Sequence, residues 1–395
     1  MHIDNAQFNG KMHSMIARSI KPQISKYLQS DDRGKVFFVW GPRRSGKTTL
    51  LEEVSREYKT TIYNFDLYSE REKFVPDRDI LSKIAAENKV ILIDEIQNYP
   101  EATLAVKILI DNFNVKIIAT GSSELRRTSK DFDSLAGRYR EIFCLPLSAE
   151  EIRKYSAPKP SEEKPFNKKM AQDLIIYGAY PEVYLEKSSE EAKIDLLQKL
   201  FDSYVLKDVI DIYNLKNSKL AKDILTKIAL QIGSEVSTRE IANSLQANMT
   251  TVANYIEIFI KNYVLIPLPS FKTNLRRAVS ENRKLFFYDL GIRNVLVKDF
   301  RPLELRPDKG GVWENFIVSE VEKQRKVCNF LRTLYFYREY GGREVDLVIE
   351  DYKKRYVCAE IKIIKEKAKD IFPLPHKQLT INQDNYMQKI TEVWQ

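Results

Sequence analysis

The feature that most constrains this chain is an octapeptide, GPRRSGKT at 41–48, which lies between an apolar run and a helical one. It fits the pattern G-x-x-x-x-G-K-[ST]. The preceding VFFVW at 36–40 reads as a buried strand, and the following residues, beginning TLLEEV, read as a helix. A glycine-rich loop between a strand and a helix surrounds a phosphate with backbone N–H groups and a helix N-terminus. The octapeptide therefore predicts a nucleotide-phosphate site in an α/β domain.

Each position of the octapeptide has an expected role. Gly41 and Gly46 let the backbone curl, Lys47 neutralises β- and γ-phosphate charge, and the Thr48 hydroxyl ligates Mg²⁺. The residues expected to bind the nucleotide are Gly41, Pro42, Arg43, Arg44, Ser45, Gly46, Lys47, Thr48, Thr49 and, from the end of a later strand, Ser122.

A second apolar run, VILI at 90–93, ends in two acids. Phosphate chemistry of this kind needs a carboxylate on a neighbouring strand to hold the metal, and Asp94 is the expected Mg²⁺ partner. Glu95 points to the other side of the strand and is expected to polarise the attacking water. For transition-state charge we favour Arg138, in LAGRYR, as an arginine finger that acts either within its own chain or across a subunit boundary.

Residues 218–266 have the layout of a winged helix-turn-helix. Ser237 is expected to cap one helix, and NMTT at 248–251 is expected to turn into the next. The candidate DNA contacts are Asn248, Thr250, Thr251 and Asn254 for bases, with Arg276 and Arg277 for phosphates. The first turn of this recognition helix carries no arginine or lysine, so the competing interpretation is a module used for protein packing or as a rigid joint.

The C-terminal part returns to strands and carries acids inside apolar runs. Asp346 lies in EVDLVIED, and Glu360 and Lys362 lie in CAEIK, with Glu314 on a preceding helix. This set resembles the restriction-endonuclease-like PD-(D/E)xK fold, in which carboxylates hold Mg²⁺ and the lysine steadies the attacking water. Buried charges of this kind are usually paired or metal-bound. The alternative is a binding or structural role in which Lys362 pairs with one carboxylate.

The expected fold class is α/β, with a P-loop core built on a parallel sheet, then a helical lid, a winged helix and an α/β restriction-endonuclease-like domain. The predicted boundaries are 1–152 for the core, 153–217 for the linker and lid, 218–282 for the winged helix, and 283–395 for the last domain. Within them, 12–29 reads as an amphipathic opening helix and 153–170, with its prolines and charges, as an exposed loop.

Five segments together resemble a known family: GPRRSGKTTLL, VILIDEIQNYP, ATGSS, LAGRYREIFCLPLS and YGAYPEV. They are similar to AAA+ superfamily ATPases of archaeal and bacterial type that bear a C-terminal domain of unknown function. The resemblance covers nearly the whole chain, and its first two motifs are the specific ones. It implies an AAA+ core, ATP as the nucleotide, and action as a molecular switch or ring motor. A homo-oligomer and a protein partner are both among the assemblies we consider.

Charge and composition bear on the partners. The net charge of +9 favours a polyanion such as DNA. Only three histidines and three cysteines are present, which argues against imidazole-based hydrolysis and a disulfide framework. The start of the chain lacks a signal-peptide layout and no apolar run is long enough for a membrane span, so we expect a cytoplasmic protein with no membrane partner. Two functions remain: ATP hydrolysis coupled to DNA binding, remodelling or processing, or an ATP-dependent signalling or assembly switch that binds protein partners.

Overall fold

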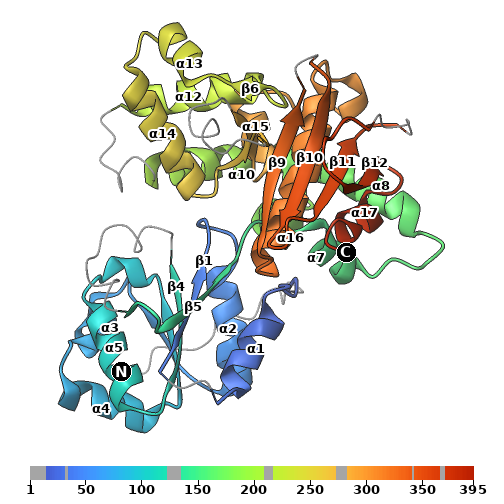
Figure 1. Cartoon of the computed structure of the whole chain (residues 1–395). Helices are drawn as coiled ribbons and strands as arrows, with labels where there is room; N and C mark the ends of the chain where they lie inside the picture. Colours follow the sequence, from blue (N-terminus) through green and yellow to red (C-terminus); the bar gives the residue numbers. More distant parts are fainter. Residues whose placement is uncertain are drawn as a thin grey trace.

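The structure is a computed structural model, and it describes residues 15–31, 34–121, 135–208, 217–272, 283–339, 342–364 and 370–395. Ser122, Arg276 and Arg277 therefore lie outside the described residues. In the described ranges no helix is both long and apolar enough to cross a membrane. Figure 1 shows the N-terminal sheet and its helices at the lower left, a helical module above it, and a C-terminal sheet on the right.

The N-terminal sheet has five parallel strands, which confirms the α/β core predicted from the apolar runs. In sheet order they are β2 (Ile62–Asn64), β3 (Val90–Asp94), β4 (Lys116–Gly121), β1 (Val36–Trp40) and β5 (Tyr139–Phe143). Successive residues of β1 enter opposite cores, with Phe38 and Trp40 in one and Phe37 and Val39 in the other. Because both faces of the sheet are buried, β1 and β3 are almost entirely apolar.

Helices cover both faces of this sheet. One face packs against α4 (Arg78–Glu87) and α5 (Ala102–Asn112), and the other against α1 (Lys21–Gln29) and α2 (Lys47–Tyr58). Shorter turns are α3 (Tyr68–Arg71), η1 (Glu72–Phe74) and η2 (Ile96–Asn98). The prediction of one opening helix over 12–29 was wrong at its start, because residues 15–20 are not helical and α1 begins at Lys21. Pro22 lacks an N–H and suits the first turn of a helix.

The chain between the sheet and the helical module is itself helical. Its elements are α7 (Ala149–Ser156), α8 (Glu163–Tyr177), α9 (Pro181–Leu185), α10 (Glu190–Leu200) and the π-helical η4 (Phe201–Asp208). The expected loop over 153–170 was therefore wrong, except at 157–162. Pro165 is tolerated because it lies in the first turn of α8, where backbone N–H groups have no helical partner. Side chains of α7 and α8 share a core with the C-terminal domain rather than with the N-terminal sheet.

The helical module consists of helices followed by a small antiparallel sheet. In chain order it contains α12 (Ser218–Leu230), β6 (Glu235–Val236), α13 (Thr238–Ser244), α14 (Met249–Lys261), β7 (Leu265–Pro269) and β8 (Arg283–Phe287). The three strands lie in the order β6-β8-β7. Ser237 caps α13 by accepting from the Glu240 N–H, as expected from the sequence. The winged helix-turn-helix interpretation of this module stays a prediction.

The C-terminal domain packs a four-stranded sheet against long helices. Its elements are α15 (Leu290–Val297), η6 (Leu303–Leu305), α16 (Lys309–Val327), β9 (Arg332–Arg338), β10 (Glu344–Asp351), β11 (Tyr356–Ile361), β12 (His376–Ile381) and α17 (Tyr386–Glu392). The sheet order is β12-β11-β10-β9, with β10 and β11 forming an antiparallel hairpin. The core of α16, with Trp313 and Phe316, also receives Leu174 of α8 and Tyr386 of α17.

Candidate nucleotide site and associated sites

The phosphate loop joins β1 to α2 and requires glycine at two places. Gly46 lies in the left-handed region at φ +95° and precedes the first residue of α2. A Cβ on Gly41 would lie 2.0 Å from the carbonyl oxygen of Cys144. The first-turn N–H groups of α2 have no helical partner and are directed into the loop. This geometry suits an anion held by the backbone.

The side chains of Lys47 and Ser45 are bonded within the phosphate loop itself. The Lys47 ammonium is buried and donates to the carbonyl oxygens of Gly41 at 3.1 Å and Pro42 at 2.9 Å. The Ser45 hydroxyl also donates to Pro42 O, at 2.8 Å. A phosphate entering the loop would therefore exchange neutral carbonyl partners of Lys47 for charged oxygens, which make stronger hydrogen bonds.

The acid at the end of β3 lies beside the start of α2. The Thr48 hydroxyl donates to Asp94 Oδ2 at 2.8 Å, and the Thr120 hydroxyl of β4 donates to the other carboxylate oxygen. Asp94 is buried. A hydroxyl and a carboxylate are hard oxygen donors of the kind that Mg²⁺ prefers, so Thr48 and Asp94 fit the ion that the sequence implies.

Glu95 has an unusual backbone conformation. Its φ of 54° and ψ of 48° place it in the left-handed region, which is unusual for a residue with a side chain. Its carboxylate accepts from the Gln97 carboxamide, and its own N–H donates to Thr120 Oγ1 at 3.4 Å. Strained backbone of this kind persists where the surrounding structure requires a specific side-chain position.

Lys47, Thr48 and Glu95 line one cavity of about 560 Å³. Its walls come from the phosphate loop, Asp66, Glu95 and the short helix α9. Across it, the Arg44 guanidinium pairs with Glu182 of α9 at 2.7 Å. From the sequence, YGAYPEV supported only the family resemblance, and α9 was not assigned to the site. A proline that can begin a helix, Pro181, was the local signal, but only the fold brings it opposite Gly46.

Arg18 is a buried residue that the sequence analysis missed. Its guanidinium donates to the backbone carbonyls of Ser45 and Leu145 and pairs with Glu151 of α7 at 3.0 Å. Burial alone would raise the pKa of Glu151, but the Arg18 charge and N–H donors from Ser148 and Ser19 bring that pKa below its ordinary value. Arg18 thus links the phosphate loop to the segment that leaves β5.

Comparison with known proteins decides the class of the N-terminal domain. Residues 33–153 match the family described as AAA domain. This part of the chain is an AAA domain. The rest matches two families described as domains of unknown function, DUF8612 over residues 168–303 and DUF4143 over residues 309–382. The match to an AAA domain supports a nucleotide-binding ATPase as the function of residues 33–153.

Relatives extend over most of the chain. An uncharacterized protein of Methanocaldococcus jannaschii is 27% identical over 90% of this chain and 84% of its own. An uncharacterized protein of Haemophilus influenzae is 25% identical over 71% of this chain and 73% of its own. Among solved structures, the RuvB Holliday junction branch migration motor of Thermotoga maritima is 16% identical, with a TM-score of 0.29, over 64% of this chain and 90% of that one.

Arg138 lies at the amino end of the parallel strands, whereas the phosphate loop lies at their carboxyl end. It immediately precedes β5, and its carbonyl accepts from the N–H of Val36, the first residue of β1. The loop follows the last residue of β1, so about 16 Å of strand separates the two at about 3.3 Å per residue. Arg138 pairs with Asp111 at 3.0 Å and is 42% exposed. It does not reach the phosphate loop of its own chain.

The predicted base-reading residues lie at the start of α14. Thr250 and Asn254 are exposed and Thr251 is half-buried. The Asn248 carboxamide oxygen, however, accepts from the N–H groups of Thr250 and Thr251 and caps the helix. Asparagine directly before a helix is a common cap, so this use was readable from the sequence.

The structure brings the four predicted nuclease-like residues together at one end of β10 and β11. The Lys362 ammonium lies 3.0 Å from Glu360 and 3.7 Å from Asp346, so it pairs with both strand carboxylates. Asp346 also accepts from the Ile361 N–H at 2.7 Å. Burial, together with the charges of Asp346 and Glu344, raises the pKa of Glu314 to about 8.

Two residues of this cluster were missed. Glu344 of β10 lies beside Glu314 and Asp346, and Lys284 of β8 pairs with both glutamates. Lys284 is far from the cluster in sequence, and nothing in its local pattern distinguishes it from a lysine at a strand end. Only the packing of β8 against the C-terminal domain places it there.

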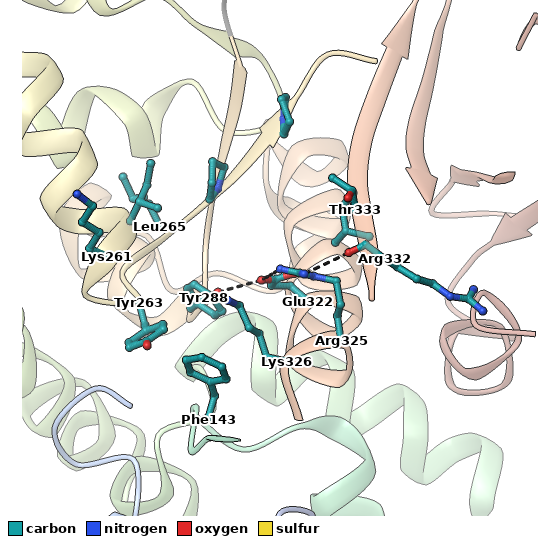
Figure 2. Close-up of a pocket in the computed structure, with 14 residues that line it drawn as sticks. Phe143, Lys261, Tyr263, Leu265, Tyr288, Glu322, Arg325, Lys326, Arg332 and Thr333 are labelled. Atoms are coloured by element: carbon teal, nitrogen blue, oxygen red, sulfur yellow. Dashed lines mark hydrogen bonds and ion pairs between the residues drawn. The ribbon is translucent and has the colours of Figure 1, made fainter. Parts of the chain in front are cut away.

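A second cavity, of about 580 Å³, lies where the AAA domain meets the rest of the chain. Figure 2 shows Phe143, Tyr263 and Tyr288 gathered around Lys326, whose ammonium lies 4.6 Å from the Phe143 ring centroid. Tyr288 donates to Glu322 at 3.2 Å. These contacts join the end of β5 to α16, so this cavity belongs to the joint between domains.

Proposed function

We propose that the protein is a Mg²⁺-dependent ATPase that couples hydrolysis of ATP to binding, remodelling or processing of DNA. The observation that supports the ATPase part is the gathering of Lys47, Thr48 and Glu95 around one cavity beside Asp94. Mg²⁺ held by Thr48 and Asp94 would neutralise charge on the phosphates.

The residues of this chain divide the remaining work. Lys47 would bind the β- and γ-phosphate oxygens, together with the loop N–H groups. Glu95, on the cavity wall, would accept a proton from the attacking water and orient it toward the γ-phosphate. Gln97 holds the Glu95 carboxylate from one side and fixes its direction.

The contacts of α9 give the AAA site a route to the helical module. Arg44 in the phosphate loop pairs with Glu182 of α9. Just before α9, the Ala179 N–H donates to Asp289 at 2.6 Å, and Asp289 caps α15 through the Ile292 N–H. α15 packs against α12 of the helical module. A shift of α9 on nucleotide binding would therefore be passed to the module through buried hydrogen bonds.

The DNA part of the proposal is supported by the net charge of +9 and by the exposed polar start of α14. The competing function, an ATP-dependent switch that binds protein partners, is favoured by one observation. The Asn248 oxygen is used in capping, and the first turn of α14 carries no cation.

Thr250→Glu should weaken binding of a fluorescent duplex by about tenfold, because it places a negative charge in the expected DNA interface, where the charge repels the phosphate backbone. The measurement is anisotropy at several salt concentrations, with the wild-type affinity falling steeply as salt rises. Ser161→Glu, an exposed change between α7 and α8, is the matched control and should bind like wild type. Binding that ignores both salt and Thr250→Glu would favour the protein-partner switch.

Arg138 fits the proposal only as a residue that acts on a neighbouring protomer. Arg138→Ala should lower ATP turnover by about tenfold, since a positive charge near the transferred phosphoryl group would be lost. Mixing Arg138→Ala with Lys47→Ala should restore part of the turnover, because one partner supplies the intact site and the other the arginine. Mixtures no more active than the sum of their components would show that Arg138 has no role between chains.

A further inference from the structure

The helical module and the C-terminal domain are joined by a buried lysine. Lys284 lies on β8, in the small sheet of the module, and its side chain is 1% exposed. Its ammonium bonds to Glu314 of α16 at 2.7 Å and also to Glu344 of β10. The same ammonium lies 5.4 Å from the ring centroid of Phe336 on β9. A single side chain of the module therefore reaches three elements of the other domain.

The acids that Lys284 meets are grouped as they would be around a metal ion. Glu314, Glu344 and Asp346 each offer a carboxylate oxygen, and these oxygens lie within 4.8 Å of one another. Three carboxylates at this spacing repel one another unless a cation lies among them. Lys284 supplies a positive charge to two of them, and Lys362 supplies one to Asp346 and Glu360.

Neighbouring pairs hold Lys284 in this position. Arg338 of β9 pairs both with Glu344 and with Glu235, and Glu235 lies opposite Lys284 in the β6–β8 ladder. Arg283, the preceding residue, pairs with Glu257 of α14 at 2.6 Å. The lysine is thus fixed at its backbone by the module and at its ammonium by the C-terminal domain.

A divalent cation does not fit this arrangement. Mg²⁺ needs carboxylate oxygens free to coordinate it in near-octahedral geometry. Here the carboxylates already accept from two ammonium groups and from the Ile361 N–H. The residues expected to form a nuclease centre are present, but in this arrangement they are occupied by lysines.

We propose that Lys284 is a built-in cation that takes the place of a divalent metal ion in the C-terminal carboxylate cluster. The helical module thereby keeps a metal ion out of the cluster. In this arrangement the C-terminal domain binds DNA without cleaving it. Removing the Lys284 charge would leave Glu314 and Glu344 as open oxygen ligands beside Asp346, and the cluster would then take a divalent or trivalent cation. This goes beyond the proposed ATPase function and does not depend on it.

The test is binding of Tb³⁺ to the full chain, with luminescence sensitised by tryptophan. Trp313 lines a cavity of about 450 Å³ with Glu314, Asp346 and Lys362, so an ion bound there would be sensitised. All proteins carry Asp94→Asn, which removes the other expected cation site. Lys284→Met is expected to bind Tb³⁺ at least about tenfold more tightly than the protein with Lys284, because two acids lose their internal cation. Adding Glu314→Gln to Lys284→Met should remove this gain in Tb³⁺ affinity. Mg²⁺ should compete with Tb³⁺ for the site in Lys284→Met.

The protein with Lys284 gives a second readout that does not depend on the stability of Lys284→Met. In this protein we expect no saturable Tb³⁺ site that depends on Glu314, so Glu314→Gln should not change its Tb³⁺ signal. Thermal unfolding adds a third readout, since Mg²⁺ should raise the midpoint of Lys284→Met but not that of the protein with Lys284. A tight Tb³⁺ site that requires Glu314 while Lys284 is present, or equal Tb³⁺ affinity with and without Lys284, would overturn the proposal. ATP turnover enters none of these measurements, so failure here and failure of the ATPase function are separable.

Discussion

Glu95→Gln is expected to bind ATP within about twofold of wild type while its turnover number falls by on the order of 10³, as loss of a general base does. The substitution preserves the size of the side chain and its contact with Gln97 but removes the carboxylate that would accept the proton of the attacking water. Binding is measured with a fluorescent ATP analogue and turnover by phosphate release with Mg²⁺.

Two further variants serve as controls for Glu95→Gln. Glu101→Gln changes an exposed acid before α5 and should leave both quantities unchanged. Lys47→Ala should instead lose binding, because Lys47 is the buried cation of the phosphate loop. If Glu95→Gln hydrolyses ATP at the wild-type rate, the assignment of the general base is wrong.

Arg18→Met is expected to lower the free energy of unfolding by about 3–5 kcal/mol, which is typical of breaking a buried ion pair from one side. The side chains of Arg18 and Glu151 are 7% and 3% exposed, so the loss leaves Glu151 buried without its cation. The backbone carbonyls of Ser45 and Leu145 also lose a donor. Urea unfolding followed by circular dichroism gives the difference.

The double variant Arg18→Met with Glu151→Gln should recover part of this loss, since no uncompensated charge stays buried. The pH dependence follows from the pKa of Glu151, which is below its ordinary value in the folded chain. The stabilisation that this carboxylate contributes is therefore present above its ordinary pKa and is lost as pH falls through the folded pKa. The gap between wild type and Arg18→Met should narrow in that acidic range. If Arg18→Met lowers the free energy of unfolding by less than about 1 kcal/mol at neutral pH, as for an exposed ion pair, Arg18 does not stabilise the fold as a buried ion pair.

Local patterns predicted the AAA core well. The strands β1 and β3, the phosphate loop and the acid that ends β3 are each specified by a few consecutive residues, because strands buried on both faces are nearly continuous apolar runs. The same holds for the helix caps at Ser237 and Asn248, although the second was interpreted as a base contact. The expected loop over 153–170 failed because composition cannot show that Pro165 falls in the first turn of a helix.

The parts that were missed depend on contacts between distant segments. Arg18 reaches Glu151 across 133 positions, and Lys284 reaches Glu344 across 60. Glu182 meets Arg44 only because α9 returns to the phosphate loop. In each case the charged residue looks like a surface residue in the sequence. Its partner is set by the packing of whole domains, which no short pattern records.

The most direct test of the central claim is steady-state ATP hydrolysis by the full chain with Mg²⁺, alone and with single-stranded, duplex and branched DNA. Glu95→Gln serves as the blank. The proposal predicts Mg²⁺-dependent hydrolysis that at least one form of DNA stimulates, with the stimulation lost at high salt. Hydrolysis that no DNA changes would contradict the coupling to DNA and favour the protein-partner switch, and no hydrolysis above the Glu95→Gln blank would contradict the ATPase function itself.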